Sequence, residues 1–380
     1  MKELKIKPHD LLFFRDAKPM SAGEGYGNGC NMPNPNILHS AIRTALLKND
    51  GLLPKEKTSS THSRDKGKNR KYGIDKFGSL QVMNLFPYHD QYGILFPIPK
   101  DVLNADRHGL KITVLNRIDD KRIVPVSTIP PTKERVSGFW TELQLIAYLK
   151  KETVDFTPVK QEEIWQPEWR VGVEIEGISN SSKEGQLYAG EYMRLDDKSS
   201  FVAEVSINES EGNLSGLHNI HFGGEKKLAS ISEAVNIFPE WNPSELSSGC
   251  IVKWILLTPA IFGNGALPSW LFSQNKEDKK PVGNVRLQPR IDGVKTAIEA
   301  ELLCCSVGDP KPISGWDTLD KMAKPSLLSV QSGSVYYFKC TTKEDAKNLV
   351  KALHSKNRSD MLSEQGFGFG VCSIENNIFI

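Results

Sequence analysis

The pattern of apolar and polar residues is clearest in the second half of the chain. Apolar residues at i, i+3, i+4 and i+7 predict a helix over residues 343–356. They are Ala346, Leu349, Val350 and Leu353. Apolar or alternating runs predict strands at 251–257, 297–305, 333–339 and 371–374. The second half is therefore expected to form a sheet backed by a helix.

The first half begins with a strand and a helix and then loses its regular pattern. Residues 4–14 are expected to form the strand and residues 36–49 the helix. Residues 50–165 are rich in proline and glycine, which predicts a long irregular region whose one clear helix runs from about Trp140 to Lys150. Further elements are then expected: strands at 170–176, 185–195 and 200–207, and a short helix at 230–235. The whole pattern predicts two α+β sandwiches, with the boundary between them near residues 247–249.

Length and composition fit two ordinary domains. A chain of 380 residues can bury two separate cores. Hydrophobic residues make up 39% and charged residues 25%, which is typical of a soluble globular protein. No apolar run approaches the roughly 18–20 residues of a membrane span, and no signal-peptide pattern precedes the first strand. We therefore expect a cytoplasmic protein without a membrane partner.

No metal, cofactor or catalytic motif is apparent. The six cysteines are scattered and lack the spacing of a zinc site or a disulfide framework, so we expect them to pack as small apolar residues. His218 and His221 could present two metal ligands, but no cysteine or carboxylate partner has a matching spacing. Neither a Gly-x-Ser-x-Gly motif nor a phosphate-binding Gly-x-x-x-x-Gly-Lys-Ser/Thr loop occurs. We expect no metal, no cofactor and no catalytic residue.

Positive charge is distributed unevenly along the chain. The net charge is only +2, which argues against a uniformly basic surface. Residues 55–76, however, carry a basic stretch that includes Arg64, Arg70 and Lys71. Such a stretch is either a basic arm that binds nucleic acid or a solvated loop that keeps the protein soluble, and the pattern leaves both open.

The segment from Asp10 to Arg43 carries the most specific pattern. The apolar residues 11–14 run into a charged turn that contains Arg15 and Lys18, and a glycine run and a helix start follow. A buried strand that leads through a charged, pliable loop to a helix N-terminus is suited to holding a phosphate or an exposed backbone.

A second glycine loop precedes the last expected strand. Its residues are Gly366, Phe367, Gly368, Phe369 and Gly370. Alternating glycines let a backbone approach a ligand closely, and the two rings either stack on bases or anchor the loop in the core. The spacing is not Gly-x-Gly-x-x-Gly and the loop leads into a strand, so a dinucleotide-binding fold is disfavoured.

Short blocks along the chain, taken in order, resemble a known family. They include Asp10-Leu-Leu-Phe-Phe-Arg-Asp-Ala-Lys-Pro-Met20, Ser40-Ala-Ile-Arg43, Arg170-Val-Gly-Val, Tyr192-Met-Arg-Leu195, Phe222-Gly-Gly-Glu225, Leu257-Thr-Pro-Ala260, Gly315-Trp-Asp317, Lys324-Pro-Ser326, Gly333-Ser-Val-Tyr-Tyr-Phe338 and Gly366-Phe-Gly-Phe-Gly370. The set resembles the third subunit of the Cmr series in type III-B CRISPR effector complexes, which belongs to the RAMP superfamily. The resemblance spans nearly the whole chain.

The resemblance implies a fold, a role and partners. The fold would be two ferredoxin-like (RRM-like) domains in tandem: residues 1–245, with a large insertion at about 50–165, and residues 246–380, with the glycine-rich loop. The role would be that of a non-catalytic RNA-binding subunit in antiviral defence. It would hold the 5′ handle of crRNA and dock the large polymerase-like subunit beside other RAMP subunits, and it would meet target RNA only through the complex.

The resemblance also suggests RNA-binding residues. Gly366–Gly370 match the glycine loop of the superfamily, and Arg15, Lys18 and Arg43 lie in the matching opening block. Together with the basic residues Arg64, Arg70 and Lys71 they are the expected contacts with RNA.

Two other functions remain open. A RAMP endoribonuclease that processes precursor crRNA would need a positioned histidine, and His39 with Tyr26 is the one arrangement that the sequence offers. A general single-stranded RNA-binding module would show the Lys/Arg-Gly-Phe/Tyr-Gly/Ala-Phe pattern on a strand, and neither half has it.

Overall fold

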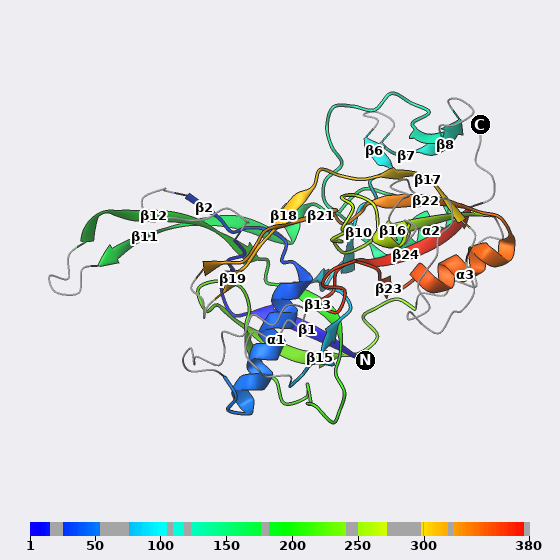
Figure 1. Cartoon of the computed structure of the whole chain (residues 1–380). Helices are drawn as coiled ribbons and strands as arrows, with labels where there is room; N and C mark the ends of the chain where they lie inside the picture. The colour runs from blue at the N-terminus through cyan, green and yellow to red at the C-terminus, as the bar shows by residue number, and fades with distance from the viewer. Residues whose placement is uncertain are drawn as a thin grey trace. The chain divides into compact units, whose positions relative to one another are not determined.

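The computed structural model forms two compact units (Figure 1). It describes residues 1–15, 26–53, 76–104, 109–117, 123–175, 182–240, 250–271, 298, 300–317 and 322–375. Unit 1 comprises Met1–Leu85, Ile164–Val235 and Pro312–Leu327, and unit 2 comprises Phe86–Glu163, Asn236–Lys311 and Leu328–Ile380. This division differs from the expected one, because most of the segment expected as an insertion in the first domain lies in unit 2.

Unit 1 is built on an antiparallel sheet in which β1 lies between β13 and β15. Its strands are β1 (Lys2–Pro8), β3 (Gln81–Val82), β13 (Ser199–Ser206), β14 (Asn219–His221) and β15 (Leu228–Ala234). Leu4 and Ile6 alternate with polar residues along β1 and are buried, and Ile6 lies opposite Phe201 and Ile231. One face of the sheet therefore forms the core of the unit.

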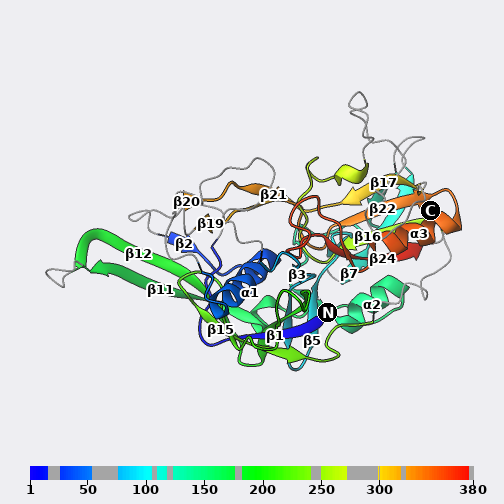
Figure 2. The same cartoon turned by 60° about the horizontal axis from the view of Figure 1, so that its bottom comes forward.

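Helix α1 (Pro35–Asn49) packs on this sheet, where it contacts β3 and β14 (Figure 2). Pro35 occupies the start of the helix, where its fixed φ and missing N–H cost nothing, and Lys48 lies in the last turn, near the negative end of the helix dipole. Leu38, Ile42 and Leu46 are buried at helical spacing. The predicted helix at 36–49 is confirmed.

A long two-stranded ribbon belongs to unit 1. β11 (Trp165–Ile175) and β12 (Ser182–Leu195) pair antiparallel, and β2 (Tyr26–Asn28) runs parallel to β12 on its other side. The ribbon is visible in both cartoons as the green pair of strands (Figures 1 and 2). Trp169, Val171 and Val173 lie exposed on one face of β11. A short pair, β19 (Trp316–Asp317) and β20 (Met322–Ala323), completes the unit.

Unit 2 contains a five-stranded antiparallel sheet in the order β17-β22-β16-β24-β23. The strands are β16 (Ile251–Leu256), β17 (Ala300–Ser306), β22 (Val335–Cys340), β23 (Lys356–Asn357) and β24 (Phe369–Glu375). Numbered by their order along the chain, the four long strands lie across the sheet in the order 2-3-1-4, that is, β17, β22, β16 and β24. Helix α3 (Lys343–Leu353) connects the third strand, β22, to the fourth, β24. That order is the one expected for a ferredoxin-like half.

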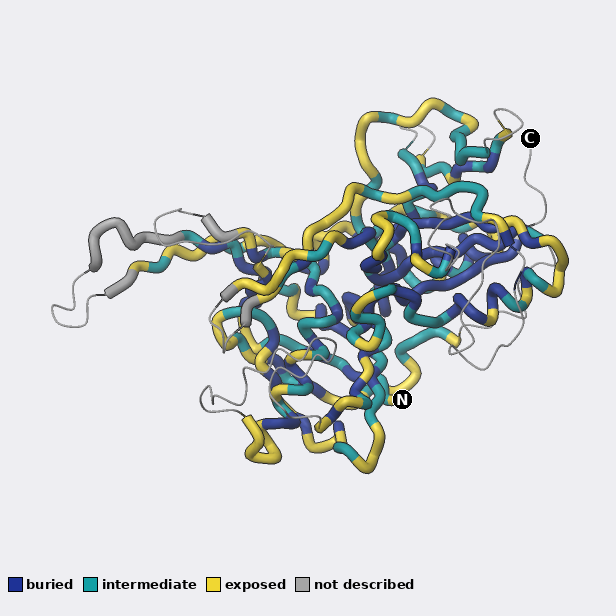
Figure 3. The backbone as a smooth tube through the Cα atoms, in the orientation of Figure 1, coloured by how far each residue is buried: buried dark blue, intermediate teal, exposed yellow. Residues whose placement is uncertain are grey.

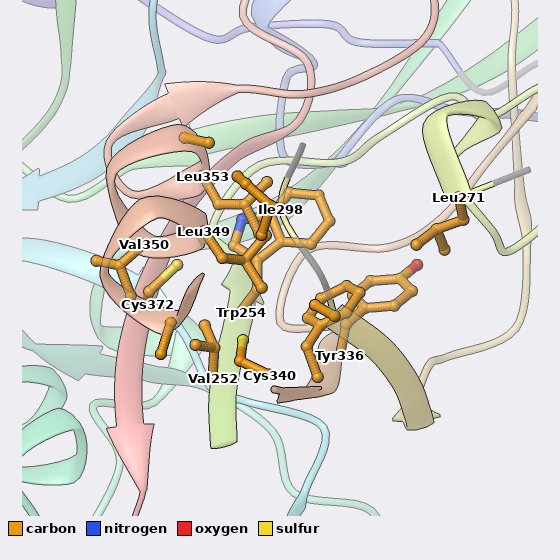
Figure 4. Close-up of a cluster of buried hydrophobic side chains, with 14 of the residues drawn as sticks. Val252, Trp254, Leu271, Ile298, Tyr336, Cys340, Leu349, Val350, Leu353 and Cys372 are labelled. Carbon is orange, nitrogen blue, oxygen red and sulfur yellow. The ribbon is translucent and has the colours of Figure 1, made fainter. Parts of the chain in front are cut away.

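The core of unit 2 lies between this sheet and α3 (Figure 4). Val252 and Trp254 point from β16 toward Leu349 and Leu353 of the helix, with Tyr336 beside them. The central strands β16, β22 and β24 are buried along most of their length and are dark blue in Figure 3, whereas the edge strands β17 and β23 are mostly half-buried. Thr342 caps the helix: its Oγ1 accepts from the amide of Asp345, three residues into the first turn, and the Asp345 carboxylate accepts in return from the Thr342 amide.

The alternate face of β16 carries a buried ion pair. Lys253 Nζ lies 3.2 Å from Asp101 Oδ2 and 3.2 Å from the Tyr148 hydroxyl. The hydroxyls of Tyr148 and Tyr337 donate to the same carboxylate over 2.7 and 2.6 Å. Each polar group of this buried cluster thus has a hydrogen-bond partner within the cluster, which holds residues 101 and 148 against the sheet.

Residues 86–163 are more regular than the sequence suggested. They contain β4 (Phe86–His89), β5 (Gly93–Pro97), β6 (Val102–Asn104), β7 (Leu110–Ile112), β8 (Val114–Arg117), β9 (Ile123–Val126), β10 (Phe139–Thr141), α2 (Glu142–Lys150) and the 3-10 turn η3 (Gln161–Glu163). Helix α2 has a capping box between Thr141 and Gln144, and the predicted helix is confirmed. The expectation of an irregular region is wrong, because short strands broken by prolines leave no alternation long enough to detect.

Two other predicted elements are wrong. The strand predicted over 4–14 ends at Pro8, and the chain then leaves the sheet. The short helix predicted at 230–235 is strand β15, which pairs with β1. Unit 1 thus has α1 as its one helix within the described ranges, and two tandem ferredoxin-like domains stay a prediction. The remaining regular elements are η5 (Ser269–Leu271), β18 (Lys311–Ile313) and β21 (Leu327–Ser329).

None of the described helices is long and apolar enough to cross a membrane. Overall the described chain is a mixed α/β protein dominated by strands.

Candidate functional site

The opening segment is anchored in unit 1 by backbone hydrogen bonds on two sides. Leu12 exchanges a pair of hydrogen bonds with Met193 of β12, at 2.9 and 2.8 Å. The amide of Phe14 donates to the carbonyl oxygen of Gly29 over 2.8 Å. Leu11, Leu12, Phe13 and Phe14 are all buried. The segment is therefore a fixed buried strand-like stretch outside the main sheet.

Glycines surround Phe13 because nothing larger fits there. The amide of Gly224 donates to the Phe13 carbonyl oxygen over 2.7 Å. A Cβ on Gly29 would overlap the Phe13 ring and lie 2.6 Å from the carbonyl oxygen of Glu191. Gly223 has φ +96, and a Cβ there would lie 2.9 Å from the Phe13 carbonyl oxygen. The Phe222-Gly-Gly-Glu225 block is thus a turn whose glycines leave room for the opening segment.

Tyr192 closes the other side of this anchor. Its ring centroid lies 5.0 Å from that of Phe13, and its hydroxyl donates to Glu225 Oε2 over 2.6 Å. Lys227 Nζ lies 5.3 Å from the centroid of the Tyr192 ring, within cation–π range. We call Phe13, Gly29, Tyr192, Gly223 and Gly224 the opening anchor.

Arg15 leaves the opening anchor directly toward solvent. Its side chain is exposed, one residue after the buried Phe14. Arg43 is half-buried on α1, where its Nη2 donates to the carbonyl oxygen of Lys76 over 3.5 Å. The predicted contacts Lys18, Arg64, Arg70 and Lys71 lie outside the described residues. RNA contact by all of these side chains stays a prediction.

Two further arginines, which the sequence reasoning missed, lie on the ribbon: Arg170 on β11, and Arg194 on β12 beside the opening segment. Arg170 Nε donates to Glu168 Oε1 over 2.9 Å, and Arg194 Nε donates to the other oxygen of that carboxylate. Arg194 also lies 3.9 Å from Asp10. The hydrogen bonds from Arg194 and Arg170 lower the pKa of Glu168 to about 2. Both arginines stand inside blocks that carried the family resemblance, and that was the available signal.

The C-terminal glycine loop is buried in unit 2. Gly366 and Gly368 have positive φ, at +95 and +78. A Cβ on Gly368 would overlap the amide of Ser359 and lie 2.9 Å from its Cβ, and one on Gly370 would lie 2.8 Å from the carbonyl oxygen of Ile255. These glycines are required by backbone conformation and close packing.

Phe367 and Phe369 anchor this loop. Both rings are fully buried, which agrees with the core-anchor interpretation and leaves no ring surface for stacking on bases. Phe86 lies 6.3 Å from Phe369 between ring centroids. Contact of the loop with RNA stays a prediction, and within the described fold it would have to come from the backbone.

Thr258, which follows β16, forms two hydrogen bonds with the glycine loop. Its Oγ1 donates to the carbonyl oxygen of Gly366 over 2.7 Å and accepts from the amide of Phe369 over 2.9 Å. The amide of Gly368 donates to the carbonyl oxygen of Pro259 over 2.7 Å. The Leu257-Thr-Pro-Ala260 block therefore serves to position the glycine loop.

The histidine of the endoribonuclease alternative is engaged with the backbone. His39 Nε2 lies 3.2 Å from the carbonyl oxygen of Leu80, in keeping with a packing role for this half-buried residue of α1. The side chain of Tyr26 is outside the described part of the structure. Among the described residues, no three His, Cys, Asp or Glu side chains gather as metal ligands would.

Comparison with known proteins gives the family. No curated protein matches the chain. Two similar solved chains come from the type III-B Cmr-beta complex: one bound to cognate target RNA and AMPPnP (state 1), with 16% identity and TM-score 0.50, and one bound to cognate target RNA, with 15% identity and TM-score 0.47. Each similarity covers 88% of this chain and 86% of the solved chain.

A third similar structure is the Csm3-Csm4 subcomplex of the type III-A CRISPR-Cas interference complex, at 15% identity and TM-score 0.35, which covers 90% of this chain and 94% of that one. At 16% identity the first neighbour shows likeness of fold alone. The family model described as "CRISPR-associated protein (Cas_Cmr3)" matches residues 4–376. Because that match spans almost the whole sequence, the chain belongs to the Cmr3 family of CRISPR-associated proteins.

Proposed function

We propose that the chain is a non-catalytic RNA-binding subunit of a type III-B CRISPR effector complex. In this role it holds the 5′ handle of crRNA and docks the large polymerase-like subunit beside other RAMP subunits in the cytoplasm. The observation that carries the proposal is the family match over residues 4–376. A fold similar to a chain of a Cmr-beta complex bound to cognate target RNA supports it.

The geometry of unit 1 fits the gripping role. The opening anchor fixes the backbone up to Phe14, so the exposed Arg15 starts from a rigid base. A cation on a rigid base loses less conformational freedom when it binds a phosphate than one on a mobile loop. We propose that Arg15 and Lys18, three residues further along the chain, bind the phosphates of the handle.

The geometry of unit 2 supports the predicted fold. Its 2-3-1-4 antiparallel strand order with α3 before the last strand fits a ferredoxin-like domain, and a second such domain is proposed for the first half. The glycine loop, whose last two residues begin β24, has the place expected of the superfamily's loop.

A variant of the assembled complex tests the proposed grip. Arg15→Gln should lower the amount of crRNA that co-purifies with the complex, because it removes a charge that contacts phosphate without disturbing the buried anchor. Lys198→Gln, which removes an exposed charge elsewhere in unit 1, is the matched control. Equal crRNA content in the two variant complexes would contradict the assignment of Arg15.

The non-catalytic role has its own test. The purified chain should leave a repeat RNA intact under conditions in which a RAMP endoribonuclease cleaves it. Cleavage that is lost in His39→Ala would establish the endoribonuclease alternative instead.

A further inference from the structure

The ribbon of β11 and β12 in unit 1 has one apolar face that is open to solvent. Trp169, Val171 and Val173 alternate along β11 and therefore lie on the same side of it. Their exposed fractions are 53%, 68% and 42%. Nearer the base of the ribbon the same face is buried, at Trp165 and Met193. The three exposed residues, which we call the apolar ribbon face, thus continue a buried apolar surface outward.

The facing strand adds one acidic group to this surface. Ala189 of β12 lies opposite Val171, and Glu191 lies opposite Trp169. Residues directly opposite each other in an antiparallel pair share one face of the sheet, so Glu191 adjoins the apolar ribbon face. Glu191 is half-buried, and within the described ranges no cation pairs with its carboxylate.

The cations of this ribbon lie on its other face. Arg170 alternates with Trp169 along β11, and its Nε donates to Glu168 Oε1 over 2.9 Å. Arg194 donates to the other oxygen of the same carboxylate. The described residues of β11 and β12 on the apolar side include no lysine or arginine. An RNA backbone is bound through cations, and this side offers a carboxylate instead, so it is not suited to nucleic acid.

A protein surface fits the apolar ribbon face better. β11 is the outer strand in the described order β11-β12-β2, and an exposed apolar strand at a sheet edge promotes unwanted association unless it is covered. Contiguous exposed apolar side chains mark protein interaction sites, and tryptophan is among the residues that contribute most to binding. A partner that covered this face would also desolvate Glu191. Because a buried, unpaired carboxylate is costly, the partner must place a lysine or arginine opposite it.

We propose that the apolar ribbon face, with Glu191 at its edge, is a docking surface for a neighbouring protein subunit of the effector complex. That subunit meets Trp169, Val171 and Val173 with apolar side chains and Glu191 with one basic side chain. The inference rests on the proposed function for the existence of the complex. It adds to that function a protein contact on one side of the ribbon, opposite the side that carries Arg170 and Arg194.

Reconstitution of the complex from purified subunits and crRNA tests the surface. The measured quantity is the affinity of the full chain for the remaining subunits. Val171→Asp should weaken it by about tenfold or more, because it places a second carboxylate in an apolar contact. Val235→Asp is the matched control: Val235 is 80% exposed, also lies in unit 1 and should bind as the wild type does.

Charge reversal at Glu191 distinguishes a protein partner from RNA. Glu191→Lys should also weaken the affinity for the other subunits, because it repels the basic side chain of the partner. If RNA covered this face, the same variant would instead bind the crRNA-containing complex more tightly, since it adds a cation. Tighter binding therefore overturns the inference.

Photo-cross-linking identifies the occupant directly and does not depend on a destabilising variant. The photoreactive amino acid p-benzoylphenylalanine, placed at position 171 of the chain in the assembled complex, should cross-link to a protein subunit. Cross-links to crRNA or to added target RNA, or no cross-link at all, overturn the inference. So does wild-type affinity of both Val171→Asp and Glu191→Lys, and in each of these cases the proposed function stands. A wild-type chain that joins no crRNA-containing complex overturns the proposed function as well.

Discussion

The amide of Gly224 donates a 2.7 Å hydrogen bond to the carbonyl oxygen of Phe13. These residues are far apart in the sequence, and each belongs to a block that carried the family resemblance. The contact explains why the blocks occur together: the double-glycine turn makes room for the backbone of the opening segment. The charged turn that begins at Arg15 thereby starts from a fixed point.

The first prediction concerns the opening anchor. Gly29→Ala should lower the free energy of unfolding by about 1–3 kcal/mol, because a methyl group there overlaps the Phe13 ring and the Glu191 carbonyl oxygen. Gly216→Ala is the matched control, since a Cβ at Gly216 meets nothing within 4 Å. Urea unfolding of both variants measures the difference. Equal stabilities would show that the anchor is not tightly packed.

The second prediction separates strain from packing in the glycine loop. Gly368→Ala combines a positive φ with overlap on Ser359, so it should cost about 1 kcal/mol for strain and a further 1–3 kcal/mol for overpacking. Gly265→Ala has a positive φ of +73 and open space around it, so it should cost the strain alone. If thermal unfolding shows equal losses for the two, close packing is not the reason for glycine at 368. Loss of RNA from a Gly368 variant complex is therefore interpretable only beside its stability.

The third prediction concerns the buried ion pair. Lys253→Met should destabilise the protein by about 3–5 kcal/mol, because it leaves the Asp101 carboxylate buried with two tyrosine hydroxyls and no cation. Adding Asp101→Leu removes the unpaired charge, so the double variant should lose less than the sum of the two single losses. A double-mutant cycle from denaturant unfolding provides the comparison. Strict additivity would mean that the two charges do not interact.

The fourth prediction is a pH dependence. Burial lowers the pKa of His354 from 6.5 to about 4 in the folded chain, where its Nδ1 accepts a hydrogen bond from the Cys372 amide over 3.0 Å. Between these values the unfolded chain binds a proton that the folded chain does not, so stability falls as the pH drops from about 6.5 to about 4. The full loss from this residue is at most about 3 kcal/mol.

The control for that titration is His354→Asn, which keeps a hydrogen-bond acceptor near the Cys372 amide and cannot take up a proton in this range. The free energy of unfolding of the variant should depend less steeply on pH between 4 and 6.5 than that of the wild type. Parallel curves would assign the pH dependence to other groups.

The sequence predicted best where one periodicity extends over a whole element. The apolar stripe of α3 and the apolar run of β16 both correspond to observed elements. The predicted strand over 4–14 is too long, because β1 ends at Pro8, which has no N–H to continue the ladder. The local pattern of β15 predicts a helix, because its pairing with β1, more than 200 residues earlier in the chain, is a tertiary contact.

In the candidate site, too, local patterns predicted the segments, and tertiary contacts could not be predicted. Glycine and charge patterns located the opening segment and the C-terminal loop. The burial of Phe367 and Phe369, however, follows from packing that no local pattern records. Lys253 stood inside an apolar run, and its partner Asp101 is 152 residues away.

Cross-linking from the crRNA handle tests the central claim most directly. A photoreactive nucleotide placed in the 5′ handle of crRNA, inside the assembled complex, should cross-link to this chain within the peptide that contains Arg15 and Lys18. Cross-links from the handle that go exclusively to other subunits would contradict the account.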